Sequence, residues 1–184
     1  MTEYSPVKKL GILKILKEFH DLPRPAQESL LKDLYKYSEE VRLVIENRVI
    51  GAADFSDLVG KMERETVGKV RRRRIPNGRT VNAIVSSAKK SRAPYDVMMQ
   101  LEQLAYQGFI EFLNTYGGGP DSFLDHGPRH LSAYLKLVKR FVPKEQQEDV
   151  ILEVKQYLLD SNNMLTDYVD DVFTEETGMM INRL

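Results

Sequence analysis

The sequence has no cysteine, no tryptophan and no net charge. Without cysteine, disulfides, thiolate nucleophiles and cysteine-based zinc sites are excluded. Lysine and arginine total 27 and aspartate and glutamate total 27, so the overall charge predicts no attraction to nucleic acid or membranes. No apolar run approaches the ~20 residues of a membrane-spanning helix, and the N-terminal residues are too charged for a signal peptide. We therefore expect a cytoplasmic protein.

A second deficit is local, because no aspartate or glutamate occurs from Thr66 to Tyr95. Positive side chains concentrate there, and they form a candidate binding surface: Arg71, Arg72, Arg73, Arg74, Arg79, Lys89, Lys90 and Arg92. Three uses are open. The cations stabilise a helix end or pair with the acidic C-terminal stretch, which has no lysine or arginine between Gln156 and Asn182. Alternatively they bind nucleic acid, or they bind an acidic protein.

Apolar residues recur at helical spacing through the whole chain, and no stretch alternates as paired strands do. We expect an all-α fold of eight or nine helices in antiparallel hairpins. The clearest helix runs from Pro94 to Tyr116, where Gly108 would allow a close helix contact. Gly127-Pro128 predicts an interruption of the next helix, Thr80 is the expected cap of a short helix before Pro94, and the tail from Gly178 is expected to be loose.

An internal similarity joins two segments at an offset of 120 residues. Pro23, Gln27, Glu28, Leu30, Leu31, Leu34 and Tyr37 match Pro143, Gln147, Glu148, Val150, Ile151, Val154 and Tyr157. Such spacing suggests stacked helical hairpins, as in a short HEAT-like repeat, with chance similarity between two amphipathic helices as the alternative. We expect a single helical domain over residues 1–184, with halves 1–75 and 76–184 as the other division.

Two histidines and a neighbouring acid form a candidate metal site. His126 and His130 are four residues apart, which places them on one helix face, and Asp125 adds a carboxylate. The proline and glycine between the histidines oppose this geometry, and no HExxH pattern is present. The sequence indicates no cofactor. It predicts no arrangement of nucleophile and base, so an enzyme is the less favoured reading.

One segment resembles a known family. It is similar to small bacterial helical proteins of unknown function. The likeness rests on Ile84 to Lys90, a following proline, Leu101 to Tyr106, Gly108 to Phe112, Asn114 to Gly117 and Phe123. In these proteins an Ala-Lys-Lys helix precedes a Gly-x-x-Phe helix that ends in Tyr-Gly. The likeness covers about Thr80 to Tyr134. It implies an all-helical fold and leaves the activity open.

Three functions follow as expectations. The first is a non-catalytic interaction domain that uses its basic surface or a helical groove for a macromolecular partner. The second is a nucleic-acid-binding protein that uses the basic segment from Arg71 to Arg92. The third is a metal-dependent hydrolase at His126 and His130.

Overall fold

The computed structural model of the chain describes residues 11–49, 54–66 and 75–183. Over these residues the chain forms nine α-helices and no strand, which confirms the predicted all-α class. No helix in this part of the chain combines the length and apolar composition of a membrane span. The helices are α1 (Ile12–Asp21), α2 (Arg24–Tyr37), α3 (Glu39–Val49), α4 (Ser56–Thr66), α5 (Gly78–Lys90), α6 (Tyr95–Tyr116), α7 (Phe123–Phe141), α8 (Lys144–Leu159) and α9 (Thr166–Thr177).

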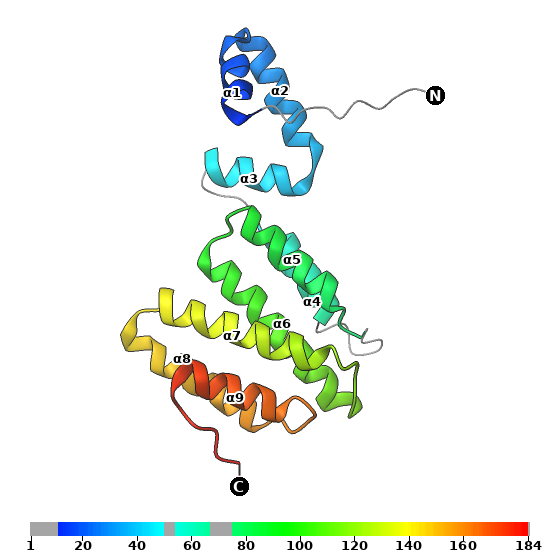
Figure 1. Cartoon of the computed structure of the whole chain (residues 1–184), viewed down its shortest axis with the longest axis vertical. Coiled ribbons are helices and arrows are strands. Elements are labelled where there is room, and N and C mark those ends of the chain that lie inside the picture. The colour runs from blue at the N-terminus through cyan, green and yellow to red at the C-terminus, as the bar shows by residue number, and fades with distance from the viewer. Residues whose placement is uncertain (1–10, 50–53, 67–74, 184) are drawn as a thin grey trace.

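The helices follow one another along a long axis (Figure 1). Helices α1 and α2, here called the arm, lie at the end opposite the C-terminus, and α3 connects them to a body made of α4 to α9. Helix α6 is central to the body because it packs against α4, α5 and α7, while α7 packs in turn against α8 and α9. Core side chains from both sides of residue 75, including Met62 and Leu101, belong to one cluster.

Helix α6 begins and ends where its sequence signals predict. Pro94 precedes it in an extended conformation, and Gly117 ends it in the left-handed region at φ 72°. Gly108 lies where α4 crosses α6. A Cβ at Gly108 would come within 2.2 Å of the Thr66 Cβ, so only glycine permits this approach. The predicted close helix contact at Gly108 is confirmed.

Helix α5 starts earlier than predicted. Its cap is Asn77 rather than Thr80, since the Asn77 side-chain oxygen accepts hydrogen bonds from the backbone N–H groups of Arg79 at 2.9 Å and Thr80 at 3.2 Å. An asparagine oxygen in this position satisfies two donors that would otherwise lack partners. Thr80 therefore lies inside the helix.

Helix α7 runs unbroken through Gly127 and Pro128, so the predicted interruption is wrong. Proline removes one backbone donor, but both residues are buried in the core. A Cβ at Gly127 would lie 2.9 Å from the Leu165 side chain, so the glycine lets the start of α9 pack directly on α7. The apolar burial offsets the lost hydrogen bond.

The C-terminal tail is docked rather than loose, because Arg183 binds the body. Its guanidinium pairs with both oxygens of Asp170 at 2.7 and 2.8 Å. It also donates to the carbonyls of Leu158 at 2.9 Å and Ser161 at 2.5 Å. Leu158 lies in the last turn of α8 and Ser161 lies just beyond it, so the guanidinium fork binds carbonyls at the C-terminal end of the helix, where positive groups are favourable.

The two matching segments each begin at a similar helix–helix corner, while the HEAT-like repeat itself stays a prediction. Pro23 precedes α2 and Pro143 precedes α8 with nearly equal backbone angles, φ −57° and ψ 143° against φ −54° and ψ 140°. The Gln27 amide donates to the carbonyls five and eight residues before it, both at 3.0 Å. The Gln147 amide makes the same two bonds at 2.7 and 3.1 Å. Each glutamine thus ties its helix to the end of the preceding one.

Glu176, at the end of α9, joins that helix to α7. Its carboxylate accepts hydrogen bonds from Ser132 at 2.7 Å and Lys139 at 2.9 Å, and the Lys136 amine lies 3.0 Å away. Burial raises the pKa of Glu176, but these donors outweigh it and hold the pKa at about 2. Because this folded-state pKa is below the ordinary 4.5, the ionised carboxylate stabilises the fold above that pH. This stabilisation is lost as the pH falls toward about 2.

We predict that Glu176→Gln lowers the free energy of unfolding by roughly 2 kcal/mol at neutral pH, because the amide cannot replace the charge. The difference from the unmodified protein should shrink between pH 4.5 and about 2, as urea unfolding at a series of pH values would measure. Glu175→Gln, at the exposed neighbouring position, is the control and should change stability little. A difference that is constant with pH would contradict the assigned role.

Candidate functional site

The most unusual polar group of the body is a histidine–glutamate pair buried between α6 and α7. His130 is 2% exposed and Glu102 is 1% exposed. The His130 Nδ1 lies 2.6 Å from the Glu102 Oε2. With the Nδ1 proton donated to the carboxylate, the Nε2 of His130 is the free acceptor, and it is buried with no partner among the described residues. At many ligand-binding and catalytic sites a carboxylate holds one ring nitrogen of a histidine like this, which fixes the tautomer and the orientation of the imidazole.

Lys89 of α5 extends the pair to a third helix. Its amine lies 3.5 Å from the Glu102 Oε1, and its side chain is 61% exposed. A buried carboxylate costs several kcal/mol unless charges or donors compensate it. Glu102 has both, with Lys89 on one oxygen and His130 on the other. Three helices therefore meet at one carboxylate.

Both histidines of α7 stack on Phe109. The ring centroids are 5.7 Å apart for His126 and 6.2 Å apart for His130, with interplanar angles of 18° and 12°. Burial lowers the pKa of His126, and the nearby His130 and Arg129 lower it further. A Cβ at Gly78 would lie 2.1 Å from the His126 Nε2, so the start of α5 touches α7 at this imidazole.

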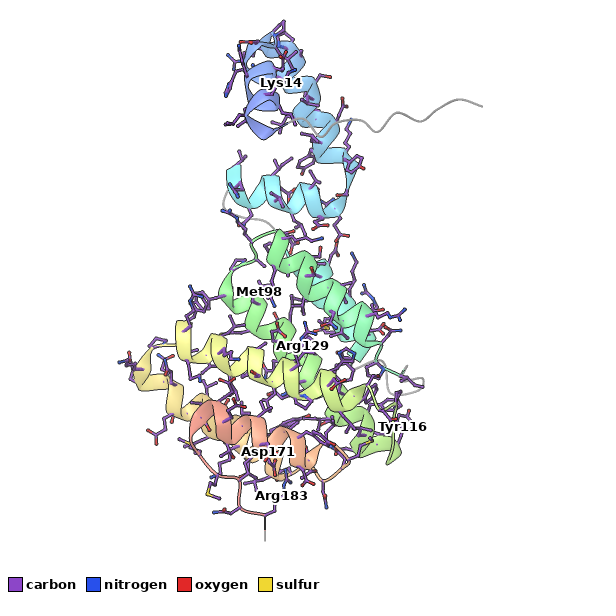
Figure 2. All side chains as sticks on the ribbon, viewed as in Figure 1. Lys14, Met98, Tyr116, Arg129, Asp171 and Arg183 are labelled. Atoms are coloured by element: carbon purple, nitrogen blue, oxygen red, sulfur yellow. The ribbon has the colours of Figure 1, made fainter. Side chains whose placement is uncertain are left out.

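A cleft of about 380 Å³ opens above the buried pair. Helix α5 supplies one wall and α7 supplies the other, with Glu102 of α6 between them. The lining residues are Asn82, Val85, Ser86, Lys89, Glu102, Arg129, His130 and Ala133. Arg129 lies in the middle of the body, far from the arm that carries Lys14 (Figure 2). The cleft has the size of small-ligand sites.

The predicted basic surface is divided between different roles. Arg71 to Arg74 lie outside the described residues. Lys89 turns toward the cleft, whereas Lys90 lies 3.4 Å from Glu40 of α3. Arg79 is exposed at the start of α5 and lines a second hollow beside His126.

Arg92 acts through its backbone. It occupies the left-handed region at φ 56° in the turn before α6. Its carbonyl accepts a hydrogen bond of 2.7 Å from the Asn47 side chain of α3. Together with Lys90, Arg92 thus connects the body to α3. The nucleic-acid hypothesis stays a prediction.

The C-terminal acids do not neutralise the described part of the basic segment. Lys89 and Lys90 take their partners from α6 and α3. The paired acids of α9 are Asp170, which binds Arg183, and Glu176, which binds two lysines of α7. The described cations and the C-terminal acids therefore stabilise separate helix contacts.

The candidate metal ligands are not gathered into one site. No group of three or more metal-binding side chains occurs within the described ranges 11–49, 54–66 and 75–183. Asp125 is exposed, and the Nδ1 of His130 is taken by Glu102. The metal-dependent hydrolase therefore gains no support from this geometry.

The residue that sequence reasoning missed is Glu102. Its signal was present, because Glu102 lies in an otherwise apolar stripe with Met98, Leu101 and Ala105. A carboxylate at a core position of a helix requires a buried partner. The partner is 28 residues away on another helix, which spacing within one helix does not reveal.

Comparison with known proteins gives no relative: no family model, no curated protein and no solved structure matches this chain. The geometry itself must therefore carry any functional inference.

We predict that His130→Ala lowers the free energy of unfolding by roughly 3 kcal/mol, because it leaves a cavity and a buried carboxylate with one partner fewer. Urea unfolding at neutral pH measures the effect. His20→Ala is the matched control, since His20 is exposed on α1 and should shift stability by less than about 0.5 kcal/mol. Equal effects of the two substitutions would show that the buried pair does not stabilise the fold.

Proposed function

We propose that the protein is a non-catalytic interaction protein that docks a macromolecular partner on its arm, and that this partner is a second copy of the chain. The observation that carries the proposal is that the apolar side chains of the arm are not buried. None of the described side chains of α1 or α2 is buried, although both helices have apolar stripes.

The exposed apolar side chains of the arm are large and numerous. They are Leu13, Ile15, Leu16, Leu22, Leu30, Leu31, Leu34, Tyr35 and Tyr37, each at least 39% exposed. Large exposed apolar side chains gathered on two neighbouring helices are typical of interaction sites on soluble proteins. The arm also projects away from the body (Figure 1).

The matching segment in the body shows how equivalent side chains are covered by neighbouring helices. Leu31 and Leu34 of α2 correspond to Ile151 and Val154 of α8 at the offset of 120. The α2 side chains are 48% and 43% exposed, whereas their α8 counterparts are 8% and 4% exposed. Helix α8 packs against α7 and α9. The arm has the same corner, but no helix buries Leu31 and Leu34 to a comparable degree. This supports the proposal that helices of a partner pack on them.

Area and charge favour a second copy as that partner. If each exposed apolar side chain of the arm contributes roughly 80 Å², pairing two arms buries on the order of 700 Å² per chain, close to the ~800 Å² per partner of a standard interface. The chain is neutral overall, so two copies do not repel one another. Two helices from each copy would form a four-helix bundle, and two-fold pairing is the commonest symmetry of oligomers.

We predict that the protein is a dimer at micromolar concentration and that combining Leu31→Glu with Leu34→Glu makes it a monomer. Charges at the centre of an apolar interface should raise the dissociation constant at least ~100-fold. Size-exclusion chromatography with light scattering measures the mass. Thermal unfolding should show an intact body, because both residues are exposed in the single chain.

The matched control combines Leu152→Glu with Tyr168→Glu, which are 47% and 49% exposed on the body. This variant should remain a dimer. A monomeric unmodified protein would contradict self-pairing, and so would a dimer that the arm variant leaves intact. If the unmodified protein is a monomer and binds a different protein through its arm, that protein and not a second copy is the partner.

A further inference from the structure

The cleft between α5 and α7 is lined on both sides by hydrogen-bond donors. Asn82, Ser86 and Lys89 lie on one face of α5, and Arg129 faces them from α7. Asn82, Ser86 and Arg129 make no hydrogen bond or ion pair with any described residue. Amide, hydroxyl and guanidinium donors that converge without partners are a typical lining for an oxyanion.

The charge of the cleft also suits an anion. Lys89 and Arg129 contribute two positive charges and Glu102 contributes one negative charge, so the lining is positive when His130 is neutral. Lys89 already lies beside Glu102 and screens its charge. Arg129 remains exposed, and its planar guanidinium can bind two oxygens of one group.

Glu102, at the base of the cleft, discriminates between anions that carry a proton and anions that do not. Glu102 has one oxygen on His130 and the other 3.5 Å from Lys89, and each carboxylate oxygen keeps a further lone pair. An anion without a proton would meet only repulsion there. An anion that carries a proton can donate it in a hydrogen bond to the carboxylate.

We propose that this cleft binds a phosphoryl group, held by Arg129, Lys89, Ser86 and Asn82, and that Glu102 selects phosphate over sulfate by accepting the phosphate proton. Near neutral pH phosphate retains a proton and sulfate does not. The site involves no residue of the arm, so it is independent of self-pairing.

Titration calorimetry of the full chain with sodium phosphate and sodium sulfate, at equal ionic strength and pH 7, tests the proposal. We expect saturable phosphate binding in the millimolar range or tighter and at least tenfold weaker sulfate binding. Arg129→Gln should weaken phosphate binding at least tenfold. Arg48→Gln removes an exposed arginine of α3 outside the cleft and should leave binding unchanged.

Glu102→Gln should reduce the preference for phosphate over sulfate to less than threefold. If this variant does not fold, the comparison of the two anions on the unmodified chain and on Arg129→Gln still decides the question. Absence of saturable phosphate binding would overturn the proposal. Equal binding of phosphate and sulfate, or phosphate binding that Arg129→Gln does not weaken, would also overturn it.

A second titration distinguishes the source of the phosphoryl group. The cleft of about 380 Å³ has room for more than one inorganic phosphate. This titration is run at about pH 5.5, where both glycerol 3-phosphate and inorganic phosphate carry a proton for Glu102. Tighter binding of glycerol 3-phosphate than of inorganic phosphate would assign the site to phosphorylated small molecules. Tighter binding of inorganic phosphate would assign it to the free ion.

Discussion

The body depends on enclosing α6, because three other helices must cover its apolar surface at once. Helices α4, α5 and α7 do so, and the contact of Gly108 with Thr66 sets how closely α4 can approach. The enclosure also determines the chemistry of the body. Glu102 belongs to this central helix, so its carboxylate is buried and can be balanced only by groups from the covering helices. His130 and Lys89 provide that balance.

Helix class and helix ends could be read from the sequence where local chemistry determines them. Proline before α6 and glycine after it define both ends by their backbone preferences alone. Pro128 misled the prediction because its effect depends on distant residues. Leu165 packs against Gly127, and burial keeps α7 continuous through the proline. The tail was misjudged for a similar reason, since it is held by the contact of Arg183 with α8 and α9 and by the packing of Met179 and Ile181 on the core.

The candidate site was predictable in parts but not as a unit. Lys89 and His130 were each singled out, one as a member of a basic surface and the other as a metal ligand. They meet through Glu102, which spacing along the chain does not connect to either. Local patterns therefore found the side chains, whereas their meeting point follows from how α5 and α7 cross α6. The arm shows the converse case, because its apolar stripes predicted helices correctly but did not predict that they stay exposed.

The two glutamine corners have a consequence beyond this chain. The corner before α8 is embedded in a packed body and the corner before α2 is not, yet their backbone angles and amide bonds agree closely. Their shape must then come from the proline and from the glutamine four residues later rather than from surrounding contacts. A helix–helix corner whose shape depends only on its own residues should keep that shape in another protein. Grafting those few residues between two helices of an unrelated protein should reproduce the same bend, which makes this joint a connector for building helical assemblies.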